Sequence, residues 1–205
     1  EHIASSIFNM IGIKAQETLL GTYEVSGKVK VVCACRDFTE GRYRLFDFCS
    51  IKNTILDSES GGSGTELADI MDTIEKQQYV EPSLLMQHFW NVFVIDALLG
   101  NFDRHNGNWG FLYDDSTKEA SLAPIYDCGS CLLPQADERI MEQALVNEDV
   151  LNARIYQFPT SAIKLDGRKI NYYDFLMSAE EPECNAAIER MVPKINLEQI
   201  KGFID

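Results

Sequence analysis

The sequence predicts an α+β fold in two parts: a small sheet-containing part over residues 1–56 and a mainly helical part over residues 66–205. Three observations support this fold class. β-Branched residues flank Ser26-Gly27, which is the pattern of a two-stranded hairpin. Residues 57–65 carry no apolar side chain and indicate a flexible joint. Residues 82–99 are apolar on nearly all sides, and this predicts a buried helix.

The first part begins with a helix and continues as strands. Residues 1–11 place Ile3, Ile7 and Met10 on one side of a helix that ends near Gly12. The hairpin then pairs ETLLGTYEV with KVKVVCACRDF. The following YRLFDFCSI is predicted as another short extended piece.

The second part alternates helices with one hairpin. Thr65 is the candidate N-cap of a helix over ELADIMDTIEKQ. The buried helix that follows has Pro82 in its first turn and Gly100 beyond its end. WGFLY and ASLAPIY flank DDSTKE, which predicts a β-hairpin. After Asp127 the remaining pieces are predicted to be mostly helical: EQALVNEDVLNA, YYDFLMS, PECNAAIERMV and NLEQIKGFI.

The charge balance limits the partners that we expect. With 32 acidic and 18 basic residues the net charge is -14, which disfavours direct binding to nucleic acid or to an anionic membrane. The chain has neither an apolar run long enough to span a bilayer nor the basic start of a secretory signal. We therefore expect a soluble, cytoplasmic protein. Because the sequence begins without Met, we also expect it to be a piece of a longer chain.

Six cysteines are predicted to be reduced thiols, because their surroundings are mostly apolar and nothing indicates secretion. Cys128 and Cys131 have the C-x-x-C spacing of a redox or zinc site, and Cys33 and Cys35 could complete four zinc ligands. As alternate residues of one strand, however, Cys33 and Cys35 would point together into a core. Zinc stays open as the less favoured alternative.

A polar loop, GNFDRHNGNWG, directly follows the buried helix. The hairpin after it returns the chain to its starting point, so Asn108 and Asp127 are expected side by side. Amide and carboxylate oxygens suit Mg²⁺, which prefers one or two protein carboxylates together with phosphate oxygens and water. Asp103 would then face an acceptor hydroxyl. Taken alone, DRHNGN is also compatible with an ordinary turn; the spaced Asp127 and Gly129 favour a phosphotransfer site.

This spacing, D-x-x-x-x-N followed by a hairpin and D-x-G, resembles the catalytic loop and metal-binding triplet of protein kinases. The spelling GNFDRHNGNWGFL with LAPIYDCGSCL is more specifically similar to the HipA-like kinases, the serine/threonine kinases of bacterial toxin–antitoxin systems. The resemblance is strongest over residues 85–133. It implies a protein-kinase-like, two-lobed fold whose small N-terminal sheet part lacks its first strands. It also implies ATP and Mg²⁺ as cofactors, a protein substrate, and a candidate antitoxin-like protein partner.

The resemblance assigns roles to the loop residues. Asp103 would be the catalytic base or would orient the hydroxyl. Asn108 and Asp127 would bind Mg²⁺. His105 would support the catalytic loop or approach the phosphoryl group, and Arg104 would add positive charge.

Outside the loop, the resemblance places Arg36, Asp37 and Phe38 at the hinge that contacts adenine. Glu1 would fall where a glutamate pairs with the ATP-binding lysine. That lysine and a glycine-rich phosphate loop are not found in the chain, and Lys28 and Lys30 lie on a later predicted strand.

Two alternatives remain beside the protein kinase. DRHNGN with YDCG also resembles the loops of phosphatidylinositol kinases, so a lipid or small-molecule kinase is open. The missing lysine favours a catalytically degenerate, partner-binding module. Three further residues are expected to be structural: Asp96 should brace the catalytic loop, since an unpaired buried charge is costly, and Trp90 and Trp109 should lie in the core.

Overall fold

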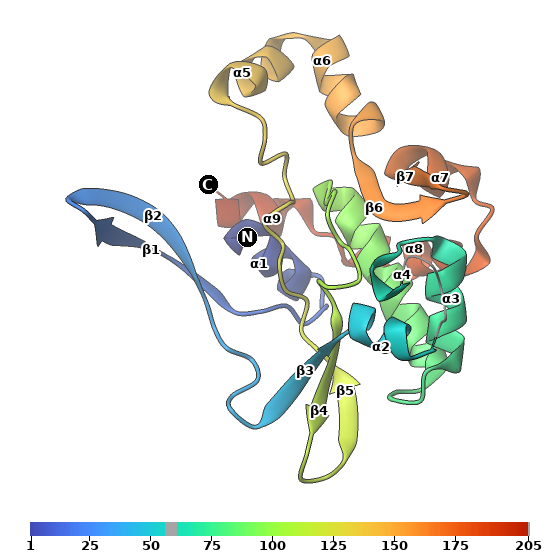
Figure 1. Ribbon diagram of the computed structural model, residues 1–205. Helices are drawn as coiled ribbons and strands as arrows, with labels where there is room; N and C mark the ends of the chain where they lie inside the picture. The colour runs from blue at the N-terminus through green and yellow to red at the C-terminus, as the bar shows by residue number, and fades with distance from the viewer. Residues whose placement is uncertain (56–60, 205) are drawn as a thin grey trace.

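A computed structural model describes residues 1–55 and 61–204 and confirms the mixture of helices and strands (Figure 1). The helices are α1 (His2–Met10), α2 (Phe48–Ile55), α3 (Leu67–Lys76), α4 (Pro82–Leu99), α5 (Glu138–Val146), α6 (Glu148–Asn152), α7 (Tyr172–Ser178), α8 (Pro182–Met191) and α9 (Leu197–Ile204). Short 3₁₀ turns are η1 (Gly61–Ser63) and η3 (Val192–Lys194), and η2 (Ala153–Gln157) is a π-helix. The strands are β1 (Thr18–Val25), β2 (Lys28–Cys35), β3 (Tyr43–Asp47), β4 (Gly110–Asp114), β5 (Glu119–Leu122), β6 (Thr160–Leu165) and β7 (Arg168–Asn171).

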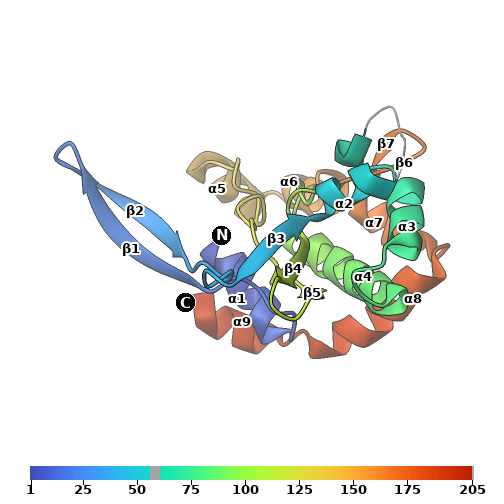
Figure 2. The same ribbon diagram turned by 60° about the horizontal axis from the view of Figure 1, so that its bottom comes forward.

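The β1–β2 hairpin is confirmed, with Val25 opposite Lys28 and left-handed φ angles of 52° at Ser26 and 74° at Gly27. It extends away from the rest of the molecule (Figures 1 and 2). One expectation about it is wrong: Cys35 is exposed and Cys33 only half-buried, rather than pointing into a core. Nearly all residues of β1 and β2 are exposed, because α1 contacts β1, for instance through His2 and Thr18, without burying either face of the hairpin.

β3, β4 and β5 form an antiparallel sheet in that order. The predicted extended piece over residues 43–51 is correct only as far as Asp47, because Phe48–Ile55 is helical. The Asp47 carboxylate ends the strand by accepting a hydrogen bond from the Ser50 backbone N–H at 2.6 Å. Opposite Asp47 in the register lies Gly110, where a Cβ atom would stand 2.2 Å from the Phe46 carbonyl oxygen. Only glycine allows β3 to approach β4 this closely.

The predicted buried helix, α4, lies at the centre of the core. Pro82 opens it and Gly100 follows it with a left-handed φ of 63°, as expected. Trp90 and Trp109 are buried, also as expected, and Trp109 stacks on Phe48 with ring centroids 4.0 Å apart. The same core takes side chains from α1, α2, α3, α7 and α8.

The predicted joint at 57–65 is only partly visible, because residues 56–60 lie outside the described residues. Its described end is bound to the rest of the fold, since the Gly64 carbonyl accepts hydrogen bonds from Lys52 and Asn106. Thr65 is not the N-cap of α3: its hydroxyl donates to the Ala162 carbonyl at 2.8 Å. Because β3 pairs with β4, the sheet joins the two predicted parts, and the division between them stays a prediction.

The C-terminal third differs from the mostly helical expectation. Helix 142–153 is interrupted at Asn147, whose side chain caps α6 by accepting from the backbone of Asp149 and Val150. β6 and β7 form a hairpin that the sequence analysis missed, although its Asp166-Gly167 turn is a strong hairpin signal. α5 and α6 form an arm that extends from the body (Figure 1). Within the described ranges, every helix is too short or too polar to cross a membrane.

Candidate active site

The polar loop and the Asp127 segment meet at one side chain, that of Arg104. Its Nη1 atom donates to the Asn108 carbonyl at 3.2 Å and to the Tyr126 carbonyl at 2.6 Å. The β4–β5 hairpin connects these two carbonyls along the chain. The structure therefore brings the backbone at Asn108 next to the residue that precedes Asp127, as the hairpin argument requires.

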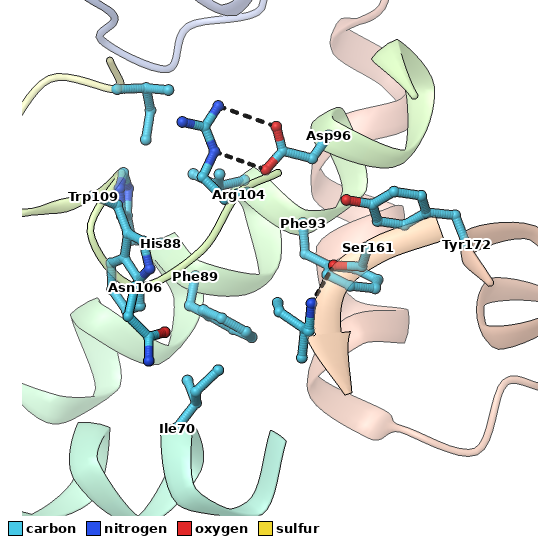
Figure 3. A pocket seen from close by; sticks show the side chains of 13 residues that line it. Ile70, His88, Phe89, Phe93, Asp96, Arg104, Asn106, Trp109, Ser161 and Tyr172 are labelled. Carbon is cyan, nitrogen blue, oxygen red and sulfur yellow. Dashed lines mark hydrogen bonds and ion pairs between the residues drawn. The ribbon is translucent and has the colours of Figure 1, made fainter. Parts of the chain in front are cut away.

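Arg104 is buried and forms a two-pronged ion pair with Asp96 of α4 (Figure 3). Nε lies 3.0 Å from Oδ2, and Nη2 lies 3.2 Å from Oδ1. Asp96 also accepts a hydrogen bond from the Asn101 side chain at 2.7 Å. The expectation that Asp96 braces the loop is confirmed. These contacts pair the Arg104 guanidinium with buried acceptors. It therefore holds the loop in place and does not present its charge at the surface.

The three oxygen-bearing side chains of the predicted site differ in burial. Asp103 and Asp127 are exposed, whereas Asn108 is buried. The Asn108 amide nitrogen donates to the Asp103 carbonyl at 3.0 Å, which fixes the amide and leaves its oxygen as the free end. Asp127 has a left-handed φ of 55°, a conformation that L-residues seldom adopt outside special sites. Within the described chain, neither carboxylate forms a salt bridge.

His105 is exposed and shapes the turn that follows it. Its Nδ1 atom accepts a hydrogen bond from the Gly107 backbone N–H at 3.0 Å, and its carbonyl accepts from the Asn108 N–H at 2.9 Å. Both contacts lie within the loop. The predicted role of His105, to support a catalytic loop or to approach a phosphoryl group, stays a prediction.

Asn106 is a structural member of the loop that the sequence analysis did not single out. It is buried, and its amide donates to the carbonyls of Gly62 and Gly64 at 2.7 and 2.8 Å. Its own carbonyl accepts from the Cys49 backbone N–H. The signal available was its place among polar residues beside a buried helix, but its partners lie more than 40 residues away along the chain and could not be read locally.

A cavity of about 20 Å³ lies beneath the loop, bordered by Asp96, Arg104, Asn106 and His88 (Figure 3). Burial, and then the nearby charge of Arg104, lower the pKa of His88 to about 4. His88 is therefore neutral at pH 7 and adds no charge beneath the loop.

Cys128, the residue after Asp127, and Cys131 are both buried. The Cys128 sulfur accepts a hydrogen bond from Arg104 Nη2 at 3.4 Å. A hydrogen bond with Cys131, together with Arg104, lowers the pKa of Cys128 to about 7. Among the described residues no cluster of three or more His, Cys, Asp or Glu side chains is arranged to hold a metal, so the zinc alternative gains no support.

The predicted hinge and Glu1 lie at the edge of this site. The Phe38 ring lies 5.6 Å from the ring of Tyr126, the neighbour of Asp127. Phe38 and Arg36 line a hollow of about 90 Å³, whereas the Asp37 carboxylate is turned to Thr39, accepting from its N–H and hydroxyl. At Gly129 a Cβ atom would lie 3.6 Å from Glu1 Oε2, so Glu1 stands beside the D-C-G triplet.

Comparison with known proteins identifies the family. The model of the HipA-like C-terminal domain matches residues 1–197. The serine/threonine-protein kinase CtkA of Helicobacter pylori strain J99 is 51% identical over 206 residues, which is 100% of this chain and 62% of that protein. The chain thus spans less than two thirds of the kinase that it matches.

Solved structures give the same result for the fold. The crystal structure of a Helicobacter pylori proinflammatory kinase CtkA matches with a TM-score of 0.95 and 50% identity, over 100% of this chain and 74% of that chain. The predicted kinase-like α+β fold is confirmed by this match. Because the family model covers nearly the whole sequence, the chain belongs to the HipA-like C-terminal domain family.

Proposed function

We propose that the protein transfers the γ-phosphoryl group of ATP to a serine or threonine hydroxyl of a protein substrate. The observation that carries this proposal is that the carbonyls of Asn108 and Tyr126 both accept hydrogen bonds from Arg104. These bonds hold the polar loop next to the segment that contains Asp127. The likeness to a serine/threonine-protein kinase supports the same reaction.

In this reaction the hydroxyl oxygen forms a bond to the γ-phosphorus while the bond from that phosphorus to the bridging oxygen of ADP breaks. Asp103, exposed at the loop surface, receives the hydroxyl proton or orients the hydroxyl. Arg104 and His105 act as positioning residues, because their contacts lie within the loop. The protein contributes mainly orientation and charge stabilisation, since phosphoryl transfer needs little covalent chemistry from it.

The donor set fits a magnesium ion. Asn108 offers a fixed amide oxygen and Asp127 an exposed carboxylate, the hard oxygen ligands that Mg²⁺ accepts beside phosphate and water. Bound with ATP, the ion would neutralise charge on the phosphates. Arg36 and Phe38 would lie against the adenine, and Asp37 would act through the turn that it caps. Glu1, beside Gly129, would pair with an ATP-binding lysine.

The setting of the reaction is a further part of the proposal. A protein substrate and an antitoxin-like protein partner follow from the family resemblance, and a cytoplasmic location is proposed with them. The net charge of -14 disfavours direct contact with nucleic acid or with a membrane. The sequence of the longest natural form of the protein would show whether a lysine and a glycine-rich loop complete the ATP site.

A partner-binding module without catalysis is the second candidate, and the β1–β2 hairpin favours it. Large apolar side chains stand exposed on both of its faces, among them Leu19 at 70% and Val31 at 78%. Exposed apolar side chains gathered on one element favour an interaction site.

Magnesium-dependent ATP binding, measured by calorimetry on the longest natural form, separates the candidates. Asp127→Ala should abolish binding, whereas Asp103→Ala should keep binding and lose phosphoryl transfer to protein. Asp115→Ala is the matched control, because this aspartate is exposed in the β4–β5 turn and lies outside the motif. Absence of ATP binding in the unaltered protein would leave the partner-binding module as the better account.

A further inference from the structure

An apolar groove of about 770 Å³ lies on the helical part, separate from the residues of the catalytic motif. Its walls come from the end of α4, the loop at 132–133, η2, α7 and the α8–η3 junction. Several wall residues are large, apolar and substantially exposed, including Leu132, Ile155, Met177 and Val192. This volume is in the range of small-molecule sites, roughly 300–1,000 Å³.

The groove contains one unusual charge, that of Arg154. Among the residues that line it, Arg154 is the charged one, and no carboxylate is present. Its Nε atom is buried without a hydrogen-bond partner, and its guanidinium forms no ion pair in the described chain but lies 4.6 Å over the Phe158 ring. In a protein with a net charge of -14, this leaves a partly buried cation without a carboxylate partner among the described residues, and such a cation can bind an anion.

The walls indicate what kind of anion fits. α4, α7 and α8 satisfy their backbone groups within each helix, so they offer no row of N–H and C=O groups to pair with an extended peptide. An aliphatic chain needs no such partners. Met177 adds an adaptable thioether to the wall.

Two backbone features also single out this groove. Arg154 lies in a π-helix, and such segments frequently occur at functional sites. Leu132 and Leu133 both have left-handed φ angles, of 60° and 54°. Strained non-glycine residues cluster at ligand clamps.

We propose that the groove binds a single long-chain carboxylate, with its tail along the apolar walls and its head group on the guanidinium fork of Arg154. Two parallel N–H···O bonds match a carboxylate to that fork. The proposal does not depend on phosphoryl transfer and concerns a different part of the surface.

Calorimetric titration of laurate into the longest natural form of the protein tests the proposal. Laurate should bind, and dodecyltrimethylammonium, with the same tail and opposite charge, should bind on the order of tenfold more weakly or not at all. Arg154→Gln should weaken laurate binding about tenfold, while Arg139→Gln, an exposed arginine on α5, should not. Met177→Asp should weaken it as well, and Met141→Asp on the arm should leave it unchanged.

Thermal melting of each variant checks that the fold persists, so that a loss of binding reports on the groove. Equal laurate affinity in Arg154→Gln and in the unaltered protein would overturn the proposal, as would the absence of laurate binding. Laurate binding by the 205-residue chain but not by the longer form would also overturn it, because another segment of the same protein would then fill the groove.

Discussion

Asp96→Asn should destabilise the protein strongly, because it removes the charge that balances a buried guanidinium. Asp96 is 1% exposed and Arg104 is 5% exposed. The carboxylate accepts from Arg104 Nε and Nη2 and from the Asn101 amide. Asparagine keeps the size of the side chain but replaces one acceptor by an NH₂ group, which would face these donors.

The magnitude follows from the burial of the pair. Breaking a buried ion pair by removing one partner costs about 3–5 kcal/mol. At about 2–4 °C per kcal/mol for a protein of this size, the midpoint of thermal unfolding should fall by roughly 6–20 °C.

Urea denaturation followed by far-ultraviolet circular dichroism measures this loss, with an unchanged m-value as the test of comparable unfolding. Asp115→Asn is the matched control. Its carboxylate also pairs with an arginine, Arg44, at 2.7 Å, but both side chains are more than half exposed. That pair should contribute less than about 1 kcal/mol.

A loss for Asp96→Asn no larger than that of the control would refute the reasoning, since it would mean that Arg104 finds other acceptors without cost. The double variant Asp96→Leu with Arg104→Met gives a second check. It should be more stable than Asp96→Asn alone, because it leaves no uncompensated buried charge.

Two further outcomes follow from the structure. Gly110→Ala should lower the free energy of unfolding by roughly 1–3 kcal/mol in urea denaturation, because its Cβ would stand 2.2 Å from the Phe46 carbonyl oxygen. Gly21→Ala is the control and should be nearly neutral, because the space around Gly21 is open. Equal effects of the two substitutions would contradict the close approach of β3 to β4. For His88, whose pKa is about 4 in the folded protein against 6.5 unfolded, the unfolded state binds more protons between these values. The free energy of unfolding should therefore fall as the pH drops from 6.5 to 4, by up to about 3 kcal/mol. His88→Asn should flatten this part of the pH profile. An unchanged profile in the variant would show that another group causes the pH dependence.

The elements that the sequence predicted well have local causes. Pro82 and Gly100 delimit α4 because proline is suited to a first helical turn and glycine to the left-handed position after the last. Ser26-Gly27 allows a tight hairpin for the same conformational reason. The Asp166-Gly167 turn carried an equally local signal, and β6–β7 could have been predicted from it.

Other features depend on contacts that the linear pattern does not contain. The exposure of Cys33 and Cys35 depends on what covers the hairpin, and strand alternation alone does not specify that. Thr65 is a good helix cap by residue type, yet the approach of β6 provides its hydroxyl with another acceptor. Asn106 became recognisable as an anchor only when the fold brought Gly62 and Gly64 to it.

The sequence by itself determined the motif: the order and spacing of Asp103, Asn108 and Asp127 on a helix, loop and hairpin that local residue preferences specify. The tertiary structure decided what the neighbouring residues do. Arg104 has the residue type of a catalytic cation, but the fold buries it against Asp96 and two backbone carbonyls, where a charge is stable only when it is paired. Burial and pairing are properties of the packed molecule. The sequence therefore predicts Arg104 as a group that adds charge to the site, whereas the structure shows it as the side chain that braces the loop.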